Sequence, residues 1–331
     1  MQGRGGIGGR RTYKQEIFKM TSNFRQLLKA SFKSEDTEEW LDVYFTRPIG
    51  LAFALMWKKL GVHPNTITIL SIFLGIAAAY MFYFTDLAHN VAGVLLLMFA
   101  NFCDSTDGQL ARLTGQKTMI GRMLDGFAGD VWFACIYISL CLRMQHQMIP
   151  GTDTEWGGLI WIIACVAGFM CHSPQSSLAD YYRQIHLYFL LGKEGSELNT
   201  YRQQVEILEN LPEKGANVDK LFYFFYARYC KSQEKRTPKF ARFFATAQKK
   251  FGTPLNIPAN IRTRLLDESR PLMKYTNILT FNARAILIYI TCIAGCPWVY
   301  MITEIIIFTI IYKYMHHKHE KMSGVLTDEI S

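Results

Sequence analysis

Apolar residues in this chain gather into six long runs separated by polar segments. A helix that crosses a bilayer needs about 20 mostly apolar residues, and the runs approach that length. The pattern predicts six membrane-spanning helices, at Ile67–Phe84, Val91–Phe102, Met119–Leu142, Leu159–Cys171, Ile278–Gly295 and Trp298–Tyr312. The second and fourth runs are short, so polar residues at their ends must complete the crossing. We expect functional groups there, because a polar group at membrane depth needs a cavity or a partner.

The segment before the first run, Trp40 to Leu60, mixes apolar side chains such as Phe45 and Phe53 with Lys58 and Lys59. We interpret it as an amphipathic helix lying in the membrane interface, in preference to a seventh span. Residues 1–39 begin with a basic, Gly-rich stretch and are predicted to be a disordered basic N-terminal extension. Residues 40–182 then comprise the interfacial helix and the first four spans.

A long polar segment, residues 183–274, separates the fourth span from the fifth and carries most of the net charge. It holds 17 Lys and Arg against 9 Asp and Glu, in a chain whose formal net charge is +9. Its basic amphipathic stretch, Lys231–Phe251, fits a helix bound to anionic headgroups, and it fits a solvated helical hairpin over the membrane domain equally well. Residues 275–331 complete the chain with spans five and six and a tail. The histidines of that tail, in HHKHE from His316 to Glu320, are read as part of a hydrated basic tail in preference to a metal site.

The predicted fold is therefore an all-α integral membrane protein, with six spans preceded by an interfacial helix and with a cytoplasmic helical insertion between spans four and five. Only 19% of the residues are charged and 50% are hydrophobic, which excludes a disordered chain. Basic residues mark the cytoplasmic side of a membrane protein, so both termini and the polar ends of spans two and three are predicted to be cytoplasmic, at a cell membrane or an endomembrane. This explanation of the charge needs no nucleic-acid partner.

Four carboxylates, Asp104, Asp107, Asp125 and Asp130, lie at the predicted cytoplasmic ends of the second and third spans. Asp104 and Asp107 are three residues apart and share a helix face. Clustered carboxylates repel one another and resist desolvation, and hard oxygen ligands suit Mg²⁺, Mn²⁺ or Ca²⁺. Two such metal ions would clamp a pyrophosphate. The alternative is a set of solvated acids at helix ends.

The same string resembles the signature of the CDP-alcohol phosphotransferase (CDP-alcohol phosphatidyltransferase) family, D-x2-D-G-x2-A-R-x8-G-x3-D-x3-D. Seven positions agree in register: Asp104, Asp107, Gly108, Ala111, Arg112, Gly121 and Asp125. The stretch HPNTIT, His63 to Thr68, also resembles the P-N-x-x-T entry to the first helix of that family. The resemblance covers about residues 40–182 and leaves the 183–274 segment outside it.

The resemblance implies a six-helix membrane enzyme, usually a homodimer, that transfers a phosphate-linked alcohol from a CDP-alcohol to an acceptor alcohol and releases CMP. Two divalent metal ions, Mg²⁺ or Mn²⁺, would be bound by Asp104, Asp107 and Asp125. The cytidine-diphosphate pocket would be lined by Gly108, Ala111 and Arg112, and Gly121 would permit close approach of the nucleotide.

The sequence departs from the signature at its last acidic position, four residues after Asp125, which is Gly129 here and is followed by Asp130. On a regular helix Asp130 points about 140° away from Asp125. We predict that a one-residue π-bulge, eased by Gly126 and Gly129, returns Asp130 to the site as metal ligand and catalytic base. The alternatives are another base, or an acceptor that is already anionic.

Further polar residues on the cytoplasmic side are candidates for binding the acceptor. Arg284 lies inside the fifth span, where it either binds an anion or snorkels to the headgroups. The full set of candidates is Lys117, Arg122, His172, Arg183 and Arg284.

The leading hypothesis is phospholipid synthesis from CDP-diacylglycerol with inositol or an inositol phosphate as acceptor, because Arg284 and the basic rim favour a charged acceptor. A CDP-ethanolamine or CDP-choline transferase acting on diacylglycerol or ceramide fits the same string. A divalent-cation transporter and an inactive scaffold are the alternatives from other classes.

Overall fold

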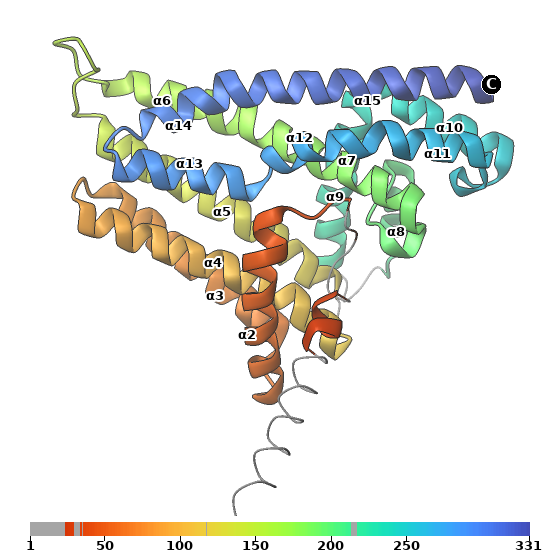
Figure 1. Ribbon diagram of the computed structural model, residues 1–331, viewed down its shortest axis with the longest axis horizontal. Helices are drawn as coiled ribbons and strands as arrows, with labels where there is room; N and C mark the ends of the chain where they lie inside the picture. Colours follow the sequence, from red (N-terminus) through yellow and green to blue (C-terminus); the bar gives the residue numbers. More distant parts are fainter. Residues whose placement is uncertain (1–23, 30–33, 35, 117, 213–216) are drawn as a thin grey trace, which may run out of the picture.

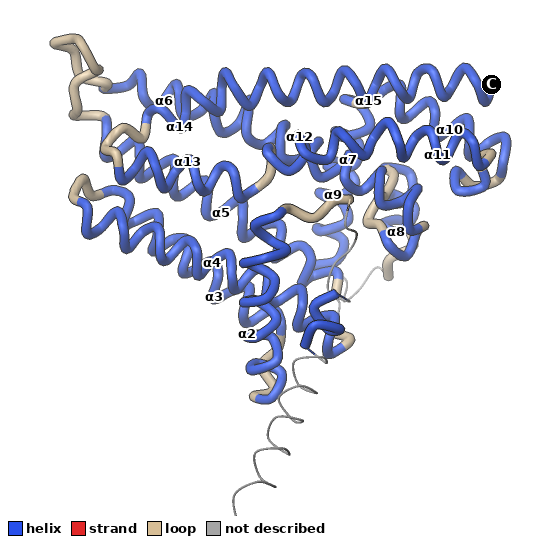
Figure 2. The backbone as a smooth tube through the Cα atoms, in the orientation of Figure 1, coloured by secondary structure: helices blue, strands red, loops and turns tan. Residues whose placement is uncertain are grey.

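The computed structural model describes residues 24–29, 34, 36–116, 118–212 and 217–331, and helices dominate them (Figures 1 and 2). Within these residues, six helices are long and apolar enough to cross a membrane, which confirms the predicted number of spans. They extend over Pro64–Tyr83, Leu87–Thr114, Leu124–Met144, Gly157–Leu191, Ala259–Ile293 and Trp298–Ile330.

The first three spans are single helices with ordinary capping signals. In α3 (Pro64–Tyr83), Pro64 occupies the first turn and the His63 side chain accepts a hydrogen bond from the Asn65 backbone N–H. In α4 (Leu87–Thr114), Asp86 caps the N-terminus and Gly115, with φ of +71°, ends the helix. In α5 (Met119–Met144), the Thr118 side chain accepts from the Gly121 N–H. These side chains satisfy backbone groups that a helix end would otherwise leave without partners.

The later spans are built from several helical pieces. Short π-helical stretches, η2 (Val166–His172) and η6 (Glu304–Phe308), interrupt the fourth and sixth spans. The fourth span comprises α6 (Gly157–Cys165), η2 and α7 (Ser173–Leu191), and the sixth comprises α14 (Trp298–Thr303), η6 and α15 (Thr309–Ile330). The fifth comprises α11 (Ala259–Ser269), η5 (Arg270–Leu272), α12 (Met273–Ile278) and α13 (Phe281–Ile293).

Before the spans, η1 (Asp42–Thr46) leads into α2 (Arg47–Lys59), which lies across the direction of the spans in Figure 1 and packs on α4. The segment between the fourth and fifth spans forms η3 (Lys193–Gly195), α8 (Tyr201–Glu209), α9 (Asn217–Arg236), α10 (Pro238–Phe251) and η4 (Pro254–Asn256). The direction of α2 is the one that an interfacial helix would take, and its location in the interface stays a prediction.

The buried apolar side chains form two main clusters. The first joins the spans and includes Phe82, Leu97, Trp132, Ile136 and Ile288. The second joins the C-terminal parts of α7 and α15 to α10 and α11. It includes Tyr182, Phe189, Phe243, Leu265 and Met322. The inserted segment and the C-terminal helix therefore share a hydrophobic core of their own.

This second core corrects the prediction of a hydrated basic tail. α15 continues to Ile330, and the His319 ring is buried and stacks on Tyr182 with 3.9 Å between ring centroids. The Tyr182 hydroxyl lies 2.7 Å from His316 Nδ1. Sequence alone missed this packing because Lys and His residues interleave with the buried Met315, Met322 and Leu326.

Two predicted boundaries also change. The boundary at residue 182 falls inside α7, whose last three turns belong to the second core. The expected disordered extension does not reach residue 39, since Asp36 and Glu39 are bound to the helices. Asp36 contacts Arg270 and His186, and Glu39 accepts hydrogen bonds from Thr280 and Asn282. Residues 1–23 lie outside the described part of the chain.

Candidate active site

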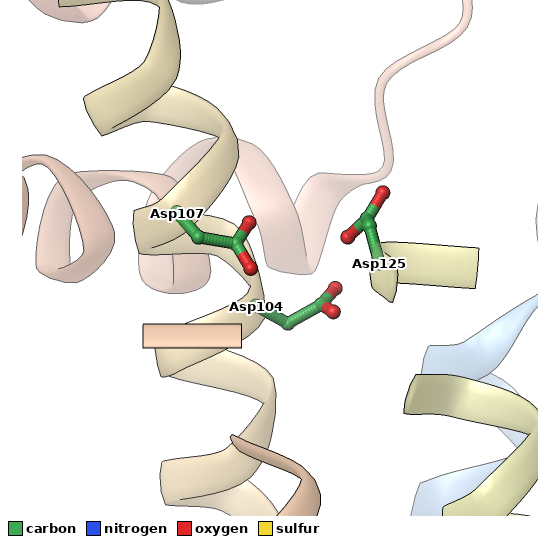
Figure 3. Close-up of side chains that lie close together, drawn as sticks. All are labelled: Asp104, Asp107 and Asp125. Atoms are coloured by element: carbon green, nitrogen blue, oxygen red, sulfur yellow. The ribbon is translucent and has the colours of Figure 1, made fainter. Parts of the chain in front are cut away.

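Three carboxylates converge between α4 and α5 (Figure 3). One oxygen each from Asp104, Asp107 and Asp125 lies within 4.8 Å of the others. Asp104 and Asp107 share a face of α4, as their spacing predicts, and Asp125 approaches from the first turns of α5. Asp107 is buried, Asp104 is half-buried and Asp125 is exposed, so the cluster is open to a ligand on one side.

Thr68 on α3 supports this cluster. Its hydroxyl donates a hydrogen bond to Asp107 Oδ2 and lies 3.3 Å from the Pro64 carbonyl oxygen. Both Thr68 and Asp107 are buried, so the contact fixes one carboxylate oxygen in a dry environment. Thr68 belongs to the HPNTIT stretch, for which the sequence predicts no function of this threonine. The available signal was the position of Thr68 as the threonine of the P-N-x-x-T pattern, which does not reveal that its partner is Asp107.

The glycines around the cluster differ in how closely they are approached. A Cβ on Gly121 would lie 2.8 Å from Asn65 Oδ1 and 3.0 Å from Thr118 Oγ1, so α3 and α5 come together at this glycine. A Cβ on Gly108 would meet only Arg112, at 3.6 Å. Ala111 and Arg112 occupy the last turns of α4. Gly121 thus holds two helices at contact distance, and Gly108 keeps its side of the cluster open.

The predicted π-bulge near Asp130 is absent, since α5 is regularly α-helical from residue 119 to residue 144. Its absence leaves Asp130 outside the group formed by the other three aspartates. Asp130 nevertheless lines the same cavity as Asp104 and Asp125. The prediction was wrong because Gly126 and Gly129 permit a distortion without requiring one, and nothing lies within 4 Å of a Cβ on either.

A cavity of about 810 Å³ lies beside the carboxylate cluster, and Asp104 and Asp125 form part of its lining. Its lining comes from α4 and the first turns of α5, from α7, from the start of α13, from the N-terminal segment 37–47, and from the inserted segment. Of the sequence-predicted site residues, the cavity brings together Asp104, Asp125, Asp130, His172, Arg183 and Arg284. Lys117 lies outside the described residues, and the Arg122 side chain is likewise not described.

Arg284 neither snorkels nor presents a free charge. It is 1% exposed and forms an ion pair with Glu304, a buried residue of the sixth span. Its guanidinium also donates to Gln175 Oε1 and to the Leu279 carbonyl oxygen, at 3.1 Å each through Nη2. His172 Nδ1 lies 3.4 Å from the same Glu304 carboxylate. The partner that a buried arginine requires is thus supplied by the protein.

The other arginines of the cavity that the structure describes are paired in the same way. Arg183 donates to Asn277 Oδ1 at 2.9 Å and lies 3.8 Å from a Glu39 carboxylate oxygen. Arg47, which sequence reasoning did not single out as a site residue, donates twice to Glu38 at 2.8 Å in a bidentate pair. Arg47 escaped notice because its charge fitted the basic side of an interfacial helix.

The donor set of the cluster fits a divalent cation. Three carboxylates whose oxygens lie this close repel one another unless protons or a cation compensate their charge. Carboxylate oxygens are the ligands preferred by Mg²⁺ and Mn²⁺. Asp104, Asp107 and Asp125 are the residues that would hold the ion, and Thr68 would orient Asp107 as an outer-shell partner.

Comparison with known proteins bears on the same part of the chain. Residues 61–172 match the model of the family described as CDP-alcohol phosphatidyltransferase. Archaetidylinositol phosphate synthase from Pyrococcus horikoshii is 35% identical over 84 residues, which cover 25% of this chain and 43% of that protein. CDP-diacylglycerol–glycerol-3-phosphate 3-phosphatidyltransferase from Rickettsia bellii is 31% identical over 87 residues, covering 26% and 48%. The chain spans about half the length of the curated relatives it matches.

Proposed function

We propose that this chain, whose residues 61–172 match the CDP-alcohol phosphatidyltransferase family model, transfers a phosphate-linked alcohol from a CDP-alcohol to a second alcohol and releases CMP. The observation that carries the proposal is the convergence of Asp104, Asp107 and Asp125, of which Asp104 and Asp125 line the cavity. All three lie within the matched segment. We propose CDP-diacylglycerol as the donor, the substrate named for the Rickettsia relative, and phospholipid synthesis as the role.

Each residue of the site has a separate role in the proposed reaction. Asp104, Asp107 and Asp125 bind the divalent cations, two in number, which when bound supply positive charge to the diphosphate. Arg112 binds the same diphosphate, since guanidinium groups suit phosphate oxygens. Gly108 and Ala111 leave room for the nucleotide on the same face of α4, and Gly121 keeps α3 and α5 close enough to frame it.

The chemical step joins the acceptor oxygen to the phosphorus atom that bears the alcohol. The P–O bond to CMP breaks, and CMP leaves with the bonding electron pair. The acceptor hydroxyl loses its proton, and we assign that proton to the Asp130 carboxylate. Asp130 suits the role because it faces the cavity without belonging to the carboxylate cluster. A base must lie within hydrogen-bond reach of the proton it takes, so the acceptor is proposed to bind beside Asp130.

The charge of the loops and the family resemblance support proposals on the orientation of the protein in the membrane and on its oligomeric state. We propose that the carboxylate end of the spans faces the cytoplasm, because the loops at the opposite end, 85–90, 144–156 and 294–298, contain no Lys or Arg and basic residues gather on the cytoplasmic side. We also propose that the chain works as a homodimer, in keeping with the family that its motif resembles.

The test is an assay of CMP release by purified protein with Mg²⁺ or Mn²⁺ and CDP-diacylglycerol against a panel of acceptor alcohols. Asp107→Asn should lower the rate by more than about 100-fold, beyond the 10- to 100-fold loss usual for outer-shell groups. Asp153→Asn is the matched control, since Asp153 is exposed in the loop at the opposite end of the spans. Metal-ion flux without nucleotide release, or equal rates for the two variants, would refute the proposed function.

A further inference from the structure

The inserted segment forms one wall of the catalytic cavity, although it lies outside the matched residues 61–172. The wall is a face of α9 and comprises Phe222, Phe225, Tyr226, Tyr229, Cys230 and Gln233. We call this set the α9 wall. The same cavity is lined by Asp104, Asp125 and Asp130 from the spans, so a molecule that contacts the wall occupies the same space as the reacting groups.

The α9 wall is held in place by contacts with α7 and with the segment before α8. Gln233 Nε2 donates to the Ser177 carbonyl oxygen at 3.1 Å, and Asn199 Nδ2 donates to the Tyr226 hydroxyl at 3.1 Å. The Phe222 and Tyr226 rings stack with 5.3 Å between centroids and 14° between planes, and the Tyr226 and Tyr229 rings lie within 18° of parallel. The wall is therefore a fixed row of stacked aromatic rings with hydroxyl and amide groups.

The positive charge of the insertion points elsewhere. Of the Lys and Arg residues that the structure describes between positions 183 and 274, Arg183 alone lines this cavity. Arg183 is bound to Glu39 and Asn277, Arg47 to Glu38, and Arg284 to Glu304. The basic rim that favoured a charged acceptor at the sequence level is therefore not part of the α9 wall.

A phosphorylated acceptor would need unpaired cationic groups at its binding surface, because a phosphate monoester carries about −1.5 to −2 charge at pH 7. The α9 wall offers aromatic rings, phenol hydroxyls and an amide instead. Rings of this kind pack well against the C–H face of a cyclic polyol, and a few polar groups set its orientation. Asp130 and Asp180 also line the cavity, and their charge would repel an anion.

We propose that the α9 wall is the acceptor site of this enzyme and selects a neutral polyhydroxylated alcohol, such as inositol, over a phosphorylated one. This rests on the function proposed above. One acceptor hydroxyl attacks the donor phosphorus, its proton passes to Asp130, and the P–O bond to CMP breaks. Tyr226 is a specificity-determining residue, because its ring is stacked at the centre of the row and its hydroxyl faces an amide partner.

The experiment measures kcat and KM for inositol, inositol 1-phosphate and glycerol 3-phosphate with CDP-diacylglycerol and Mn²⁺. The kcat/KM for inositol should exceed that for either phosphorylated acceptor by about 10-fold or more. A tenfold difference corresponds to about 1.4 kcal/mol of discrimination between the acceptors. Tyr226→Phe should raise the KM for inositol about threefold, the value of one neutral hydrogen bond. Tyr226→Ala should raise it about 10-fold or more through the added loss of ring contact. In both variants the KM for CDP-diacylglycerol should stay within about twofold.

The matched control is Phe224→Ala, which removes an exposed ring of α9 that does not line the cavity. A preference for a phosphorylated acceptor overturns the proposal, and so does a loss of donor binding in Tyr226→Phe equal to the loss of acceptor binding. These outcomes leave CMP release by the wild type intact, so they are distinct from failure of the proposed function, in which wild type releases no CMP with any acceptor. Tyr226→Phe loses the hydrogen bond from Asn199, so its melting temperature should fall only by the few degrees that one neutral hydrogen bond is worth, and a larger fall would point to a folding defect instead of a loss of recognition.

Discussion

The Thr68 hydroxyl on α3 donates a hydrogen bond to the Asp107 carboxylate on α4, and both residues are buried. This contact orients one of the three clustered carboxylates. Thr68→Val removes the donor while keeping the side-chain shape, so Asp107 is left buried with one partner fewer. We expect transfer activity to fall by about 10- to 100-fold, the usual cost of losing an outer-shell partner.

Thr68→Ser is the matched variant and should retain activity within about threefold, because it keeps the hydroxyl that donates to the Asp107 carboxylate and so preserves the hydrogen bond to a charged group. The readout is CMP release over a range of Mn²⁺ concentrations, and the Thr68→Val defect should appear as a higher requirement for Mn²⁺. A uniform loss that excess Mn²⁺ does not change would contradict a positioning role for Thr68.

Binding of a cation to the carboxylate cluster should stabilise the folded protein. A ligand at 100 times its Kd adds about 2.7 kcal/mol to the free energy of unfolding. Mn²⁺ is therefore expected to raise the melting temperature of wild type, and EDTA is expected to reverse the effect. Asp107→Asn should respond much less than Asp153→Asn. Equal responses in the two variants would place the binding of Mn²⁺ elsewhere.

A side chain at Gly121 is expected to be destabilising, because its Cβ would meet Asn65 Oδ1 at 2.8 Å and the capping Thr118 Oγ1 at 3.0 Å. Gly121→Ala forces Asn65 or the start of α5 to move, and overpacking of this kind costs about 1–3 kcal/mol. We expect a lower melting temperature and a higher KM for the CDP-alcohol. Gly158→Ala is the control, since nothing lies within 4 Å of a Cβ there, and it should be neutral or slightly stabilising in its helix.

The Arg284–Glu304 ion pair should matter most when only one partner is removed. Glu304→Ala leaves a guanidinium buried without its counter-charge, which costs about 3–5 kcal/mol. The double variant Arg284→Met with Glu304→Met removes both charges, and apolar replacement of a buried pair is often neutral or stabilising. Thermal unfolding in detergent should therefore rank the double variant above Glu304→Ala. If the double variant melted below Glu304→Ala, this would contradict the prediction, because the cost of an unpaired buried Arg284 would then be smaller than the stability lost with the whole ion pair.

Glu39 makes stability depend on pH. Burial raises the pKa of its carboxyl above the ordinary 4.5, with the Asp42 charge acting in the same direction and the hydrogen bonds from Thr280 and Asn282 opposing it. The folded state thus holds the Glu39 proton more tightly than the unfolded state does. The contribution of this group to stability is largest below pH 4.5 and falls as pH rises through the raised pKa. Glu39→Gln should lack this decline, so its melting temperature relative to wild type should increase from pH 4 to pH 7.

The pKa of Asp36 is shifted in the opposite direction from that of Glu39. Burial acts to raise the pKa of Asp36, but the hydrogen bonds and charges of Arg270 and His186 outweigh it and lower the pKa below 3.8. Its stabilising contribution is present above the unfolded pKa and is lost as pH falls through the lowered one. Asp36→Asn should therefore be destabilised at pH 7 and approach wild type as the solution is acidified. A constant difference across pH would contradict this assignment.

Much of the site was predictable because its signals are local. Asp104 and Asp107 share a face of α4 by helix geometry alone, and the run from Asp104 to Asp125 carries a recognisable motif. The position of Asp130 outside the carboxylate cluster was not predictable, because whether a helix forms a π-bulge depends on the residues that pack around it. Gly126 and Gly129 are compatible with either course. Thr68 required knowledge of where α3 lies beside α4.

The sequence by itself determined the number of spans and the segment that holds the clustered acids, since a bilayer demands long apolar helices and the motif is continuous along the chain. Only the tertiary structure decided which charges meet. It pairs Arg284 with Glu304 and Arg183 with Glu39, buries His319 against Tyr182, and turns a neutral face of α9 toward the carboxylates. These contacts join residues distant in the sequence, and they depend on how helices pack, which no periodicity within a single helix encodes.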